Sequence, residues 1–96
     1  MASSLSFEMR IADIFRFADG RTVFIGPIDS ESKFVGPCLC ELVVDGVHRS
    51  TIRLEGEMVP SGQHPEGFRS VCTQQPVVLN RETVLSSACS LRAISA

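Results

Sequence analysis

Two cysteines, Cys38 and Cys40, stand two positions apart, and this spacing makes them the first candidates for chemistry. Side chains two positions apart in a strand point to the same face, so both thiols could bind one metal ion, with His48 and His64 as further ligands. Structural zinc sites more often have cysteines spaced by two to four residues and a second such pair. The spacing therefore carries only a weak metal signal.

The two other cysteines, Cys72 and Cys89, form no second pair. Free cysteine is among the most buried residue types, so we expect the cysteines to pack in a core; metal binding and redox chemistry are the alternatives. Cys72 or Ser70 could also act as a nucleophile with a histidine as base, but no nucleophile-elbow motif accompanies them. We expect His64 to be solvated in a loop and His48 to lie near the rim of a sheet. The chain is thus predicted to have no catalytic residue, no metal ligand and no cofactor.

Two carboxylates, Glu55 and Glu57, flank Gly56 at the end of a predicted strand. Paired carboxylates can carry out acid–base catalysis, and that alternative stays open. We expect these two to be solvated charges at the rim of a sheet.

Three arginines, Arg49, Arg53 and Arg69, form the candidate binding site. Arg49 and Arg53 are expected on one face of a strand, with Arg69 nearby if its own strand pairs with that one. Because the guanidinium fork suits phosphate and carboxylate groups, this face is predicted to contact a protein or RNA partner; a solvated face is the alternative. The loop over residues 56–67 is a second candidate contact. The chain has no Trp or Tyr to stack on bases, which weakens the case for single-stranded nucleic acid.

Short apolar segments rich in β-branched residues must position these side chains. The predicted strands cover residues 7–17, 21–26, 38–44, 47–54 and 68–73, and residues 83–94 are expected to supply the last strand or strands. The period-two pattern of the first segment breaks near Ala12–Asp13, which predicts a β-bulge or a bend, with a short helix as the competitor. The glycines between the segments are typical of turns that join short strands.

The third and fourth predicted strands form a hairpin around Asp45-Gly46, a dipeptide typical of a type I′ turn. Strict alternation along the fourth strand separates its side chains into two faces. One face contains His48, Ser50, Ile52 and Leu54, and the other contains Val47, Arg49, Thr51 and Arg53.

The chain has 96 residues, of which 44% are hydrophobic and 21% charged, as expected for one globular domain. We predict a single domain over residues 7–95, preceded by flexible residues 1–6. The net charge of −2 argues against a general nucleic-acid binder. No apolar run is long enough for a membrane helix, and the first residues do not resemble a signal peptide. We therefore expect a cytoplasmic protein with reduced cysteines and no membrane contact.

These patterns together predict an all-β fold, a closed or nearly closed six-stranded antiparallel β-barrel. Closure would remove the strand edges that invite aggregation. An open sheet or a small sandwich is the alternative.

Several segments occur in an order that resembles the β-barrel domain following the GTPase domain in translation factors such as elongation factor Tu. Residues 7–15 resemble its opening strand, and Gly20-Arg21-Thr22-Val23-Phe24-Ile25-Gly26 resembles its Gly-Arg-Gly-Thr-Val-Val-Thr-Gly segment, with one glycine missing. The remaining matches are Val35-Gly36, Ser50-Thr51, Gly56-Glu57-Met58 and Glu66-Gly67. Residues 74–84 match poorly.

The resemblance implies a translation-protein-like barrel that contacts RNA or protein. The chain has no Gly-x-x-x-x-Gly-Lys-Ser/Thr loop, so the nucleotide chemistry of the family cannot be carried over. We therefore expect a small non-catalytic binding module for a protein or RNA partner. A small enzyme or metal-binding domain is the alternative, and self-association as a homodimer is a further one.

Overall fold

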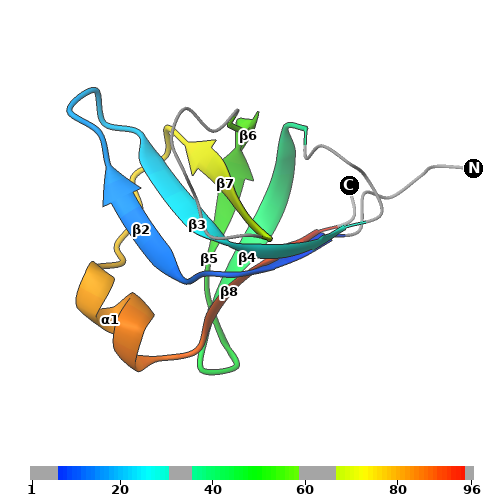
Figure 1. Ribbon diagram of the computed structural model, residues 1–96, viewed down its shortest axis with the longest axis vertical. Coiled ribbons are helices and arrows are strands. Elements are labelled where there is room, and N and C mark those ends of the chain that lie inside the picture. The colour runs from blue at the N-terminus through cyan, green and yellow to red at the C-terminus, as the bar shows by residue number, and fades with distance from the viewer. Residues whose placement is uncertain (1–6, 31–35, 59–66, 95–96) are drawn as a thin grey trace, which may run out of the picture.

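The computed structural model describes residues 7–30, 36–58 and 67–94, and these form an antiparallel sheet with one short helix (Figure 1). In chain order the elements are β1 (Phe7–Arg10), β2 (Asp13–Arg16), β3 (Thr22–Ser30), β4 (Cys38–Val44), β5 (Val47–Leu54), β6 (Gly56–Glu57), β7 (Phe68–Thr73), α1 (Arg81–Ser86) and β8 (Cys89–Ala93). The strand order is β5-β4-β8-β1-β3-β7-β6, and β2 also pairs with β3. The prediction of a small all-β antiparallel fold is confirmed.

The described residues contain eight strands where six were predicted, because the first predicted strand is divided in two and a further short strand, β6, lies in the segment predicted as a loop. The first is divided by a β-bulge between β1 and β2. Met9 pairs with Ile28 and Asp13 pairs with Ile25, so β1–β2 advances four residues where β3 advances three. The bulge lies where the period-two pattern breaks, and its prediction is confirmed. Opposite it is Gly26, where a Cβ atom would overlap the carbonyl oxygen of Arg10.

The additional strand, β6, follows β5 after a break at Glu55 and occupies the start of the predicted loop over residues 56–67, so the loop prediction is wrong there. β5 pairs with β4, whereas Gly56 in β6 pairs with Cys72 in β7, and the backbone N–H of Glu55 donates to the carbonyl of Cys72 at 2.8 Å. The two ends of the strand order therefore lie on one continuous stretch of chain. As a result the sheet curls into a half-barrel (Figure 1).

Helix α1 occupies part of the segment predicted to be the last strand. Asn80 caps its N-terminus by accepting a hydrogen bond from the backbone N–H of Thr83 at 2.8 Å, and Glu82 lies in the first turn. The cap and the first-turn carboxylate, together with the helix-forming Leu85, outweigh the β-propensity of Thr83 and Val84, so the strand prediction for this part is wrong. The last strand begins only at Cys89.

The main core fills the concave side of the curled sheet. Its fully buried apolar side chains include Met9, Phe24, Leu42, Ile52, Leu54, Val71 and Leu91. A second cluster of Val23, Ile25 and Cys72, with Met58 and Phe68 against it, is separate from this core. In the part of the chain that the structure describes, no helix is both long and apolar enough to cross a membrane.

Candidate functional site

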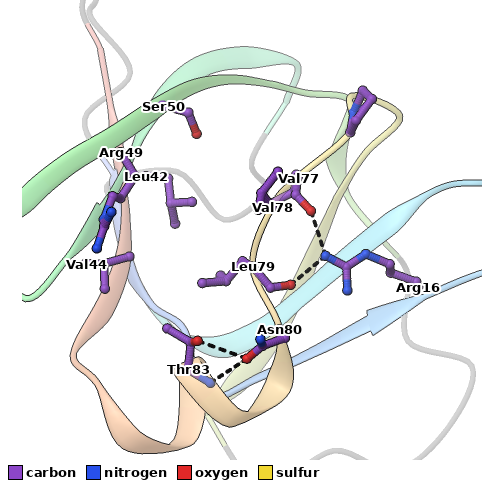
Figure 2. A pocket seen from close by; sticks show the side chains of 11 residues that line it. Arg16, Leu42, Val44, Arg49, Ser50, Val77, Val78, Leu79, Asn80 and Thr83 are labelled. Carbon is purple, nitrogen blue, oxygen red and sulfur yellow. Dashed lines mark hydrogen bonds between the residues drawn. The ribbon is translucent and has the colours of Figure 1, made fainter.

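A pocket of about 770 Å³ opens where the half-barrel is incomplete, between the β4–β5 hairpin and the segment over residues 76–80 (Figure 2). Its lining comes from β2, β4, β5, this segment and α1. The lining residues are Arg16, Leu42, Val44, Arg49, Ser50, Pro76, Val77, Val78, Leu79, Asn80 and Thr83. The volume lies within the range of about 300–1,000 Å³ that is usual for ligand sites.

The floor of the pocket is apolar. Leu42 and Val44 are inward-facing residues of β4, and Val77 and Leu79 alternate inward from the opposite segment; all four are buried. Between the last two, Val78 points away from the core and is 100% exposed. An aliphatic group bound here would cover apolar surface of both β4 and the segment over residues 76–80.

Arg16 holds one wall of the pocket in place. Its Nη2 atom donates hydrogen bonds to the carbonyl oxygens of Val77 at 2.6 Å and Leu79 at 2.5 Å, as the dashed lines in Figure 2 show. Asn80 then starts α1 by accepting from both the backbone N–H and the hydroxyl of Thr83. These contacts tie the segment to β2 and to the helix, so this wall is built in advance of any ligand.

A second bulge brings Arg49 to the opposite wall. Leu42 pairs with Ser50 but Val43 pairs with His48, so Arg49 is the extra residue of β5. Bulges re-aim side chains in this way. In the described ranges the Arg49 guanidinium has no hydrogen-bond or ion-pair partner, and the pocket lining includes no carboxylate. The site therefore combines an apolar floor with an uncompensated positive charge.

Beside the pocket, the side chain of Gln75 covers the edge of β5. Its Nε2 atom donates to the carbonyl of Thr51 at 2.8 Å, and its Oε1 atom accepts from the backbone N–H of Arg53 at 3.1 Å. The Thr73 hydroxyl donates to the carbonyl of Arg53 at 2.7 Å. This part of the β5 edge is thus closed by side chains instead of a strand.

The three predicted binding arginines do not form one patch. Arg49 lines the pocket, whereas Arg53 pairs with the exposed Leu39 on the outer side of the sheet. Arg69 forms two hydrogen bonds with the carboxylate of Glu57, at 2.7 and 2.5 Å. The expectation that Arg49 and Arg53 share a face failed because the bulge breaks strict alternation.

Two other predictions for charged residues have different outcomes. Glu57 was expected to be solvated, but its side chain is only 10% exposed in its ion pair with Arg69, and this hydrogen bond raises the pKa of the arginine. His48 does lie at an exposed position near the hairpin end, with Nδ1 at 3.0 Å from Oε2 of Glu41. It does not share the inner face with Ile52, again because of the bulge.

The cysteines pack as predicted. Cys40, Cys72 and Cys89 are buried, and Cys38 packs partly buried against the core. Burial raises the pKa of each thiol; that of Cys40 rises to about 12, with smaller contributions from Cys38 and the Glu41 carboxylate.

Nothing in the structure adds support for a metal site. Among residues 7–30, 36–58 and 67–94, no three His, Cys, Asp or Glu side chains lie close enough to hold a metal ion. His64 and most of the loop over residues 56–67 fall outside the described residues, so the predictions for them stay predictions.

Comparisons with known proteins identify no relative: no protein-family model, curated protein or solved structure matches this chain. The resemblance to the translation-factor barrel therefore stays a prediction.

Most of the pocket was missed in the sequence, although one signal was present. Asn80 stands three residues before Thr83 and just ahead of Glu82, which is a helix-start pattern. A helix there leaves residues 76–79 as an extended connection beside the sheet. No sequence pattern indicates the contact between Arg16 and that connection, because it joins residues more than sixty positions apart.

Proposed function

We propose that this chain is a non-catalytic binding module whose pocket receives a protein partner through an aliphatic group and a nearby carboxylate. One observation carries the proposal: among the described residues, the pocket combines a buried aliphatic floor with the unpaired guanidinium of Arg49 and has no acidic side chain in its lining. Such a site attracts an anion while burying apolar surface.

A protein partner fits the surroundings of the pocket better than RNA does. Val78, which lines the pocket, and Val47, which pairs with the lining residue Val44, are exposed apolar side chains. The arginines are dispersed over the sheet and partly neutralised, as in the pair between Arg69 and Glu57. The net charge is −2, and no aromatic side chain of the described residues lines the site, so a phosphate backbone finds neither a basic field nor a stacking platform there.

The raised thiol pKa values also bear on the choice between binding and catalysis. A nucleophilic cysteine needs a lowered pKa and an electropositive, accessible setting. Burial works in the opposite direction at Cys40, Cys72 and Cys89. The enzyme alternative therefore gains no support from this structure.

Selection from a displayed library of random peptides tests the proposal. We expect the selected peptides to combine aliphatic with acidic residues. They should lose binding to a Val78→Glu variant, because a fully exposed rim residue would then repel the acidic ligand without disturbing the fold. Leu85→Glu on α1 is the control, since Leu85 is exposed but does not line the pocket. Failure to select any peptide, or equal binding to both variants, would refute the proposal.

A further inference from the structure

We propose that the ligand of this pocket is an extended peptide that adds as a short strand to the open edge of β5, with an acidic side chain on Arg49 and aliphatic side chains on the pocket floor. This inference rests on the proposed function and specifies how the partner is held. Peptides commonly bind in this way, with main-chain hydrogen bonds supplying affinity and side-chain pockets supplying specificity.

The first argument is the position of β5 in the sheet. It stands at one end of the strand order, and β4 is the one strand that pairs with it in the described part of the chain. In an antiparallel pair, alternate residues turn their N–H and C=O groups away from the partner strand. The contacts of Gln75 show that Thr51 and Arg53 are residues of this outward-facing kind.

The second argument is that Gln75 already imitates a neighbouring strand. One amide group donates to the carbonyl of Thr51 and accepts from the N–H of Arg53, as a residue of a paired strand would do. Gln75 covers the β5 edge only at Thr51 and Arg53. In the described ranges, no side chain forms a hydrogen bond with the backbone of residues 47–50. Arg49 and Ser50 of this stretch line the pocket, so the uncovered edge and the cavity are contiguous.

The opposite wall offers fewer free backbone groups to the ligand's main chain than the edge of β5 does. Pro76 has no N–H to donate. The carbonyl oxygens of Val77 and Leu79 already accept hydrogen bonds from Arg16. Backbone pairing is therefore directed to β5, and the segment over residues 76–79 contributes apolar contact.

The bulge at Arg49 limits the length of the added strand. Bulges twist an edge and so discourage long pairing with other chains. Here the bulge leaves only a short outward-facing stretch that includes His48 and Thr51, and it places the guanidinium of Arg49 beside that stretch. A short segment with a matching carboxylate satisfies this edge, whereas a long uncharged strand does not.

The test uses a blocked peptide of alternating valine and glutamate, two analogues N-methylated at alternate amides, and hexanoate as a free aliphatic carboxylate. Binding is followed by NMR on ¹⁵N-labelled protein. We expect the parent peptide to shift the amide signals of His48 and Thr51. One N-methylated analogue should lose binding and the other should keep it, because only alternate amides of a strand face its neighbour.

The matched variants are Arg49→Gln in the pocket and Arg53→Gln on the outer side of the sheet. An exposed ion pair is worth little, so Arg49→Gln should weaken binding about two- to fivefold, while Arg53→Gln leaves it unchanged. Strand addition is overturned if both analogues bind like the parent, if both lose binding, or if hexanoate binds as tightly as the peptide. Pocket shifts in those cases would keep the proposed function, whereas no pocket shift with any probe would remove both.

Discussion

The close approach of β3 to the bulge between β1 and β2 makes Gly26→Ala the most informative stability variant of this protein. A Cβ atom at this position would overlap the carbonyl oxygen of Arg10 and press on the backbone N of Ala12 at 3.1 Å. Both obstacles are backbone atoms, so no side-chain rotation can relieve them. The β1–β2 strand has to move away from β3.

That movement gives up contacts that hold the bulge in place. The N–H of Ala12 donates to the carbonyl of Ile25 at 2.7 Å, and the N–H of Ile11 donates to the carbonyl of Cys89 at 2.9 Å. Each broken buried hydrogen bond costs about 1–3 kcal/mol, and overpacking adds a similar amount, so we expect a loss of about 3–5 kcal/mol. For a domain of this size that is a large share of the total, which is roughly 5–15 kcal/mol.

Equilibrium unfolding in urea measures the effect, with Gly36→Ala as the control. A Cβ atom at Gly36 meets nothing within 4 Å, so this variant should be stabilised by about 0.4–1 kcal/mol through its less flexible unfolded chain. If Gly26→Ala unfolds within about 1 kcal/mol of the unchanged protein, the bulge is not the rigid contact described above.

Two further predictions concern charge. Glu57→Gln should lower the free energy of unfolding by about 1–2 kcal/mol, because it removes the charge of one partner in the partly buried pair with Arg69. The control is Glu8→Gln in the exposed pair with Arg92, which should cost less than about 0.5 kcal/mol. Equal losses in the two variants would contradict this ranking. Burial raises the pKa of Cys40 from 9.0 to about 12, so its thiol stays protonated in the folded protein while the unfolded thiol ionises. The contribution of Cys40 to the free energy of unfolding is therefore constant below about pH 9 and falls by about 1.4 kcal/mol per pH unit above it. Unfolding of the Cys40→Ser variant across this range should show a shallower decline in stability. An equally steep decline would refute the raised pKa of Cys40.

Local patterns in the sequence were enough to predict most of the strands and the tight turn between β4 and β5, although β3 continues to Ser30, beyond its predicted end at Gly26. Asp45 and Gly46 have φ values of 51° and 81°, as the predicted type I′ turn requires. The bulge near Ala12 was readable because an interrupted period-two pattern records a change of face directly. Such features depend on neighbouring residues and need no knowledge of distant parts of the chain.

The candidate site was much less predictable, because it depends on a bulge that leaves no mark in the sequence. Strict alternation predicts that Arg49 and Arg53 lie on the same face of the strand. One extra residue in β5 is enough to put them on different faces. The ion pair of Arg69 with Glu57 joins neighbouring strands β6 and β7 whose pairing could not be read from either segment alone. Contacts of this kind appear only once the sheet has formed.

The place of β1 between β8 and β3 also governs how the molecule can fold. Glu8 pairs with Arg92, so one side of the first strand stays open until the last strand has left the ribosome. The hairpin of β4 and β5 can form locally in the meantime, but among the described strands it is β8 that pairs this hairpin with the rest of the sheet. Pairing between strands so far apart in sequence is slow, because the loop must close before its contacts repay the lost entropy. We infer that the pairing of β8 completes the sheet late in folding. Until β8 has paired, the chain exposes unpaired strand edges that bind chaperones and promote aggregation.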